Sequence, residues 1–247
     1  METQQPELRV VEVTDERGAL ARRAIALIQE AIWDVHPTRF LLTELSETRR
    51  GVAKGGGYHL LALLAPGDEE PVAAAAGAYL QAVNAGFISY LAVREDQRGR
   101  GLGGELREHL LETFRAQARR ERGEELAYVL GEVERESAWL RRLVRAGRVM
   151  PLDIHYFHPW MSRQRERYYA LYREPMADRR TELPSEEVAR IVEAIWRRAY
   201  RIRDPLQRDT YQYMMKQLEE RETVGPDPDF LAISPLPSGE GRGEGIE

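Results

Sequence analysis

Three apolar runs joined by short polar connections constrain the fold of this chain more than any other feature. The runs span residues 58–65, 71–82 and 87–93, and the connections at 66–70 and 84–86 contain Pro, Gly, Asp and Asn. Such short connections join antiparallel neighbours, because a parallel pair needs a crossover of about a dozen residues or more. The segment therefore predicts an antiparallel meander of three strands.

Helical and strand periodicities alternate on both sides of this meander. In chain order they predict a strand at 8–13, a helix from Asp15, a helix within 38–57, a helix from Leu102, a strand at 126–133, a helix at 136–146 and closing strands at 149–157 and 167–172. The helix from Leu102 is long enough to place the strand at 126–133 parallel to its predecessor. We expect a mixed α/β fold of the α+β kind, with a central, mostly antiparallel sheet flanked by helices.

The composition changes beyond Pro175, where charged helical sequence replaces the strand pattern. Ser185 caps one expected helix, and Asp204 with Pro205 opens another. From Gly225 onward Gly, Pro, Ser and acidic residues dominate. The expected organisation is an α/β domain at 1–175, a helical extension at 176–223 and a disordered tail at 224–247.

Composition excludes several classes of function. The 247 residues carry a formal net charge of -5 without a basic stripe, so nucleic acid is not an expected partner. No apolar run is long enough to span a membrane and the first residues do not resemble a signal peptide, so we expect a cytoplasmic protein without a membrane partner. The absence of cysteine excludes disulfides, thiolate zinc sites and a cysteine nucleophile.

A turn dense in glycine follows the third run of the meander and leads into the helix from Leu102. Its members are Arg98, Gly99, Arg100, Gly101, Leu102, Gly103 and Gly104. Backbone N–H groups of such a turn converge on an anion, and the helix dipole adds partial positive charge. The two arginines add charge-assisted hydrogen bonds. The pattern predicts a cradle for a diphosphate.

The same glycines also fit the dinucleotide motif G-x-G-x-x-G, so a Rossmann site is an alternative. That motif follows the first strand of its fold, with an acidic residue at the end of the next strand. Here an antiparallel meander precedes the glycines, and Glu124 and Glu125 come before the next strand. These differences favour another kind of phosphate site.

Arg98, Gly101 and Gly103 match a signature of Arg or Gln, two residues, Gly, one residue, then Gly or Ala. Through these residues and their flanks the chain resembles the GNAT N-acetyltransferases over about residues 8–172. The resemblance implies acetyl-CoA as co-substrate, with its pyrophosphate on the turn at 98–104. It also implies that backbone groups of Leu91, Ala92 and Val93 hold the pantetheine arm.

The resemblance weakens at the usual tyrosine general acid, because Leu143 stands at that place. Direct acetyl transfer still needs a proton acceptor for the amine and a donor for the thiolate. Our candidates for these roles are Tyr90, Glu132 and Tyr156; we also considered Glu134, His155 and His158. The two histidines are three residues apart on an expected strand and would face opposite ways, so we expect no metal site.

The expected function is therefore transfer of an acetyl group from acetyl-CoA to a primary amine of a small molecule or peptide, directly and in a ternary complex. One alternative keeps the fold but is a catalytically weak CoA-binding sensor or interaction module, which the leucine at 143 would suit. The other alternative is a dinucleotide-binding oxidoreductase. For the assembly we considered a homodimer.

Overall fold

The computed structural model describes residues 8–161 and 168–232, which form two compact units. Unit 1 comprises described residues 8–79 and 88–117. Unit 2 comprises residues 80–87 and the described residues from 118 to 232. The fold class is the expected one: mixed α/β, with mostly antiparallel strands flanked by helices.

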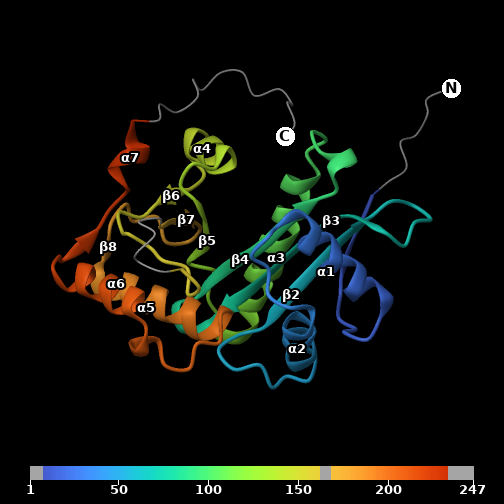
Figure 1. Cartoon of the computed structure of the whole chain (residues 1–247), viewed down its shortest axis with the longest axis horizontal. Helices are drawn as coiled ribbons and strands as arrows, with labels where there is room; N and C mark the ends of the chain where they lie inside the picture. The colour runs from blue at the N-terminus through green and yellow to red at the C-terminus, as the bar shows by residue number, and fades with distance from the viewer. Residues whose placement is uncertain (1–7, 162–167, 233–247) are drawn as a thin grey trace. The chain divides into compact units, whose positions relative to one another are not determined.

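Unit 1 contains the predicted meander (Figure 1). Its elements are β1 (Arg9–Glu12), α1 (Ala19–Ala31), α2 (Thr38–Arg49), β2 (Tyr58–Leu64), all but the last residue of β3 (Pro71–Leu80), the part of β4 (Ala85–Val93) from Ile88 onward, the 3₁₀ turn η2 (Glu95–Gln97) and the start of α3 (Leu102–Arg122). β2 pairs antiparallel with both β1 and β3. Beyond the end of β4, the N–H of Arg94 donates to the carbonyl of Val72 near the start of β3 (2.9 Å), as an antiparallel β3–β4 pair requires.

Every residue of β2 and β3 is buried, so these strands are covered on both faces. This is why their sequences are continuous apolar runs rather than alternating ones. α1 and α2 both pack against β2. The face of α1 that is turned to the interior includes Ala24, Ile25 and Ile28, which are fully buried.

Unit 2 contains the remaining strands and the C-terminal helices. In chain order it has η1 (Gln81–Val83), β5 (Tyr128–Glu134), α4 (Ala138–Arg145), β6 (Met150–Pro151), β7 (Tyr169–Pro175), β8 (Leu183–Pro184), α5 (Ser185–Ala194), the π-helix η4 (Ile195–Ala199), η5 (Pro205–Gln207), α6 (Asp209–Glu219), β9 (Thr223–Val224) and α7 (Pro228–Leu231). β7 pairs antiparallel with β5 and with β6, and β8 pairs antiparallel with β9.

The strand expected over 149–157 is reduced to Met150 and Pro151. The N–H of Leu152 still reaches the carbonyl of Leu171 on β7, but the N–H of Asp153 donates to Gly225 in the C-terminal segment (3.0 Å). One further bridge joins Tyr156 to Tyr169. The chain turns away from β7 at Asp153, because the N–H of this residue bonds to a segment that is distant in sequence. Local periodicity cannot indicate such a partner.

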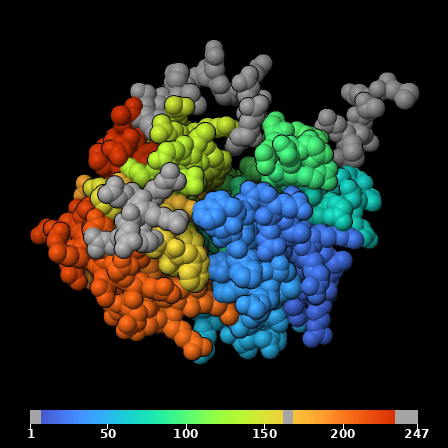
Figure 2. All heavy atoms as spheres, in the orientation of Figure 1, coloured from blue at the N-terminus to red at the C-terminus, as the bar shows by residue number. Residues whose placement is uncertain are grey.

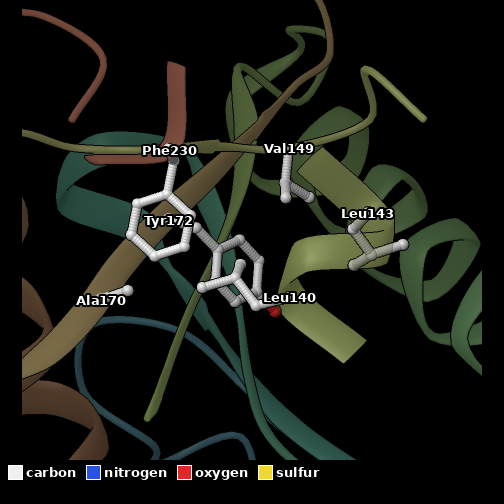
Figure 3. Close-up of a cluster of buried hydrophobic side chains, with 6 residues drawn as sticks. All are labelled: Leu140, Leu143, Val149, Ala170, Tyr172 and Phe230. Carbon is white, nitrogen blue, oxygen red and sulfur yellow. The ribbon is translucent and has the colours of Figure 1, made fainter. Parts of the chain in front are cut away.

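The expectation of disorder from residue 224 is wrong for residues 224–232, which form part of β9 and all of α7. Phe230 is buried beside Tyr172 in a cluster of apolar side chains (Figure 3). Arg135 binds the carboxylates of Asp227 and Asp229. Tertiary contacts therefore order a segment whose composition is typical of a loose tail. The rest of the expected tail, residues 233–247, lies outside the described residues.

The C-terminal extension forms the expected pair of helices, α5 and α6, which pack side by side. Their side chains make one continuous surface, in orange in Figure 2. The two compact units do not divide at residue 175, because the extension belongs to the same unit as β5, β6 and β7. Across the described part of the chain, no helix is both long and apolar enough to cross a membrane.

Candidate functional site

The glycine-rich turn joins the end of β4 to the start of α3, as the sequence predicted. Gly99 and Gly101 have φ angles of 79° and 76°, in the left-handed region that favours glycine. The first bond of the helix runs from the N–H of Glu105 to the carbonyl of Gly101 (3.1 Å). The N–H groups of the first helical turn therefore lack acceptors within the helix and can bind an anion.

Gly103 lies inside the first turn of α3, where glycine costs about 1 kcal/mol relative to alanine. A Cβ at this position would be 3.3 Å from Cγ2 of Val93 and 3.9 Å from Cδ2 of Leu91. The helix therefore starts close against β4, and the side chains of Leu91 and Val93 face it. Strand alternation turns Tyr90 and Ala92 to the opposite face, where both are buried.

The arginines of the turn differ in their partners. Arg94 binds the carboxylate of Asp96 (2.6 Å), and this hydrogen bond raises the pKa of Arg94 and lowers the pKa of Asp96. Arg98 and Arg100 are exposed and donate to neutral acceptors, the carbonyl of Val93 (3.4 Å) and the side chain of Gln97. Arg98 and Arg100 are thus the cationic side chains suited to meet an anion at the turn.

Tyr90 is bonded to His36 in the connection between α1 and α2. Its hydroxyl lies 2.7 Å from Nδ1 of His36 and accepts the backbone N–H of the same histidine (3.2 Å). The ring of His36 stacks on Phe40 with 4.1 Å between centroids. His36 was not among the sequence candidates, because no local pattern links it to a residue 54 positions away.

Glu132 lies on β5 in unit 2, with only 7% of its side chain exposed. The hydroxyl of Tyr200, at the end of the π-helix, donates to Oε1 of Glu132. Nε2 of His158 lies 3.7 Å from the same oxygen. Tyr156 is fully buried, and this burial, followed by the charge of Glu132, raises the pKa of its hydroxyl well above the ordinary value. We call these residues, together with Trp196, the Glu132 cluster.

The structure brings two of the three catalytic candidates together, Glu132 and Tyr156 in unit 2, and pairs Tyr90 with His36 in unit 1. The sequence missed Tyr200 and Trp196, because each was one aromatic residue in an amphipathic helix. Trp196 is close enough for its indole to lower the pKa of Tyr156, opposing the larger effects of burial and of Glu132.

The remaining sequence candidates lie elsewhere in unit 2. Glu134 is exposed, two residues beyond Glu132 on β5. His155 contacts Tyr213 on α6 (3.0 Å) instead of the Glu132 cluster. Leu143 is buried among the apolar side chains of Figure 3 and has no proton to give. Within residues 8–161 and 168–232, no group of three or more His, Asp or Glu side chains is placed to hold a metal ion.

These arrangements provide two kinds of chemistry. The turn offers backbone N–H groups and two arginines to a phosphate-bearing ligand. The Glu132 cluster offers a carboxylate held by proton donors, which suits transfer of a proton from an amine. The Rossmann alternative does not fit, because the turn follows β4, which runs antiparallel to β3, and not the first strand of a parallel sheet.

Comparison with known proteins gives one family. The model of the acetyltransferase (GNAT) family matches residues 25–135. The NatC complex bound to Gag peptide and CoA aligns at 14% identity over 69% of this chain and 99% of that chain, with a TM-score of 0.50. At this identity the likeness concerns the fold alone.

Two further solved structures are similar. The ribosomal-protein-S18-alanine N-acetyltransferase from Escherichia coli shares 16% identity over 70% of this chain and 96% of its own (TM-score 0.48). The PaiA N-acetyltransferase from Thermoplasma acidophilum in complex with coenzyme A shares 8% identity over 69% and 99% (TM-score 0.46). No curated protein matches the sequence significantly.

Proposed function

We propose a reaction on the premise that this chain belongs, through residues 25–135, to the acetyltransferase (GNAT) family. The chain transfers an acetyl group from acetyl-CoA to a primary amine of a small molecule or a peptide. The transfer is direct, within a ternary complex, and uses no covalent enzyme intermediate. The observation that carries the proposal is the turn between β4 and α3, with its two left-handed glycines and its exposed arginines.

The turn has the properties that a CoA pyrophosphate requires. A Cβ added at Gly101 would meet no atom within 4 Å, so there is open space beside the turn. In the proposal Arg98 and Arg100 flank the pyrophosphate, and the N–H groups of Gly99 and residues 101–104 bind its oxygens. Backbone groups of Leu91, Ala92 and Val93 hold the pantetheine arm. The bound acetyl-CoA supplies a thioester that is ready for attack by nitrogen.

Proton transfer is assigned to the three candidates that the sequence singled out. Glu132 accepts a proton from the ammonium group of the acceptor. Tyr156 stays protonated at working pH, because burial raises its pKa, and its hydroxyl faces Glu132. Tyr90, bonded to His36, is the candidate donor of a proton to the departing thiolate. The proposed roles of Glu132 and Tyr156 rest on their contacts in unit 2, and the proposed role of Tyr90 rests on its contact in unit 1.

Thermal unfolding with added ligands tests the cofactor. Acetyl-CoA, CoA, NAD and NADP are compared, because a ligand at about a hundred times its dissociation constant adds roughly 2.7 kcal/mol to the free energy of unfolding. We expect a rise in melting temperature with the CoA compounds and none with the nicotinamide nucleotides. A shift with NAD or NADP alone would contradict the proposal.

Release of the CoA thiol tests the reaction. The chain has no cysteine, so a thiol reagent reports CoA release without a signal from the protein. The acceptors to screen are spermidine, kanamycin, free amino acids, a peptide with an unblocked N-terminus and a lysine-containing peptide with a blocked one. Mass spectrometry of the product then identifies the acetylated nitrogen.

A catalytically weak CoA-binding module is the second candidate function. The specific observation in its favour is Leu143, an apolar core residue where the resembling family has a tyrosine acid. It predicts a thermal shift with CoA but no thiol release with any amine. Cytoplasmic location and a homodimer remain predictions, which cell fractionation and light scattering would test.

A further inference from the structure

The Glu132 cluster is built from segments that lie far apart in the sequence. Glu132 belongs to β5, Tyr156 and His158 follow β6, and Trp196 and Tyr200 belong to the C-terminal extension. The extension lies outside residues 25–135, which the family model matches. A segment beyond the matched domain therefore donates directly to the carboxylate that we propose as the proton acceptor.

One hydroxyl donor and one nearby imidazole face the same oxygen of the Glu132 carboxylate. The hydroxyl of Tyr200 donates to Oε1. Nδ1 of His158 accepts the backbone N–H of Trp160 (3.3 Å), so the proton of the neutral imidazole is on Nε2, which faces the same oxygen at 3.7 Å. With Oε1 held in this way, the orientation of the whole carboxyl group is restricted.

The ring of Tyr200 is itself held by neighbouring aromatic rings. The ring of His158 meets it edge to face with 4.7 Å between centroids, and the ring of Phe87 does so at 6.2 Å. The residue is buried, with 8% exposed. Its hydroxyl therefore reaches Glu132 from a fixed ring, as a positioning group requires.

The backbone of the extension is irregular where it delivers these side chains. After α5 the helix widens into the π-helix at Ile195–Ala199, and Tyr200 is the C-cap of this π-helix. Arg201 then has a φ of 54°, which is uncommon for a residue with a side chain, and the N–H of Ile202 closes back onto the carbonyl of Trp196 (3.0 Å). Such irregularities cost energy and are frequent at functional sites.

We propose that Tyr200 of the C-terminal extension is a positioning residue for Glu132, the proposed proton acceptor in the same unit. This inference rests on the proposed function. The ammonium proton of the acceptor moves to the Glu132 carboxylate, and the neutral nitrogen attacks the thioester carbonyl. A C–N bond forms, the C–S bond breaks, and the sulfur leaves as a thiolate. The nitrogen loses its second proton as the amide forms, the thiolate takes up one proton to give the CoA thiol, and the proton on Glu132 is released to solvent. The hydrogen bond from Tyr200, with the imidazole of His158 nearby, restricts the orientation of the Glu132 carboxylate during the proton transfer.

A double-mutant cycle tests the contact without any substrate. Tyr200→Phe, Glu132→Gln and the double variant are unfolded in urea, and the shifts of the midpoint are compared. We expect the shift of the double variant to differ clearly from the sum of the two single shifts, because the two residues are bonded. Additive shifts would overturn the proposal whatever the activity.

Kinetics test the role in catalysis, with Tyr213→Phe as the matched control. Tyr213 belongs to the same extension, and its hydroxyl lies 3.0 Å from Nδ1 of His155 instead of bonding Glu132. With the best amine of the screen, Tyr200→Phe should lower kcat about tenfold, leave the KM for acetyl-CoA unchanged and alter the pH profile of kcat. Tyr213→Phe should keep both constants and the profile.

Equal kcat losses in the two variants, or no loss in Tyr200→Phe, would show a merely structural extension and overturn the proposal. Failure of the proposed function is seen separately, in the wild-type protein. If the wild-type protein releases no thiol with any amine, the acetyl-transfer function fails and the catalytic role of Tyr200 fails with it, whereas a variant-specific loss concerns Tyr200 alone.

Discussion

The turn of unit 1 and the Glu132 cluster of unit 2 are two opposite ways of building a site. The turn is a short continuous stretch, exposed at residues 98–100, whose proposed ligand contacts come mainly from backbone N–H groups. The Glu132 cluster combines residues from 132 to 200, is buried and relies on side-chain hydroxyl, imidazole and carboxylate groups. The first depends on local backbone conformation, and the second depends on long-range packing.

This difference predicts how each region responds to change. Substitution of an exposed arginine of the turn should alter ligand affinity and leave the rest of the protein intact, because few tertiary contacts depend on exposed residues. A substitution in or around the Glu132 cluster should affect catalysis or stability, because buried polar groups and their packing depend on one another. Four variants test this contrast, in decreasing order of expected effect.

Glu132→Gln should have the largest effect. It keeps the size of the side chain but removes the proposed proton acceptor, so we expect kcat to fall by about 100-fold or more. The melting-temperature rise with acetyl-CoA should persist, because the turn is unchanged. Glu134→Gln, on the same strand but exposed, is the control and should keep its activity. A loss of acetyl-CoA binding in Glu132→Gln would contradict the prediction that ligand binding at the turn is independent of the Glu132 cluster.

Phe230→Ala should destabilise the protein by about 3 kcal/mol, the lower end of the range for a buried phenylalanine. Its ring is 5% exposed in the cluster with Tyr172, Leu140 and Leu143. Urea unfolding measures the effect, and the neighbouring Leu231→Ala, 66% exposed, should stay within about 0.5 kcal/mol of wild type. Similar midpoints for the two variants would mean that α7 does not pack as the structure shows.

Arg98→Ala should weaken acetyl-CoA binding about tenfold, equivalent to about 1.4 kcal/mol for an exposed charge-assisted hydrogen bond. Isothermal titration measures the dissociation constant. Arg17→Ala removes the same charge from a side chain in unit 1 that is 86% exposed, so it controls for net charge. An unchanged dissociation constant in Arg98→Ala would argue against a pyrophosphate at the turn.

The effect of Tyr156→Phe on stability should be the smallest of the four and should appear at high pH. Burial raises the pKa of Tyr156 in the folded protein, whereas in the unfolded chain it ionises near pH 10. The unfolded state therefore binds fewer protons above pH 10, and stability falls there by up to about 1.4 kcal/mol per pH unit for this group. Tyr156→Phe should show a shallower alkaline decline in urea unfolding between pH 9 and 11. An identical decline would contradict the burial of an un-ionised Tyr156.

Much of the fold was predictable because its signals are local. The meander, the turn at 98–104 and the helix that follows all come from apolar periodicity and from glycines that the backbone conformation needs. The full strand at 149–157 was not predictable, because Asp153 bonds to Gly225 instead of to β7. The order of residues 224–232 was also missed, because Phe230 is ordered by contacts with residues about 60 to 90 positions earlier.

The sequence by itself determined the conformation and the charge of the turn that we propose as the CoA site. Gly99 and Gly101 permit left-handed conformations and Arg98 and Arg100 supply charge, and all of these lie within four consecutive residues. Only the tertiary structure decided which side chains surround Glu132 and which histidine bonds Tyr90. A hydrogen bond between residues 68 or 54 positions apart leaves no periodic trace in the chain, since its energy depends on distance in space and not on distance in sequence.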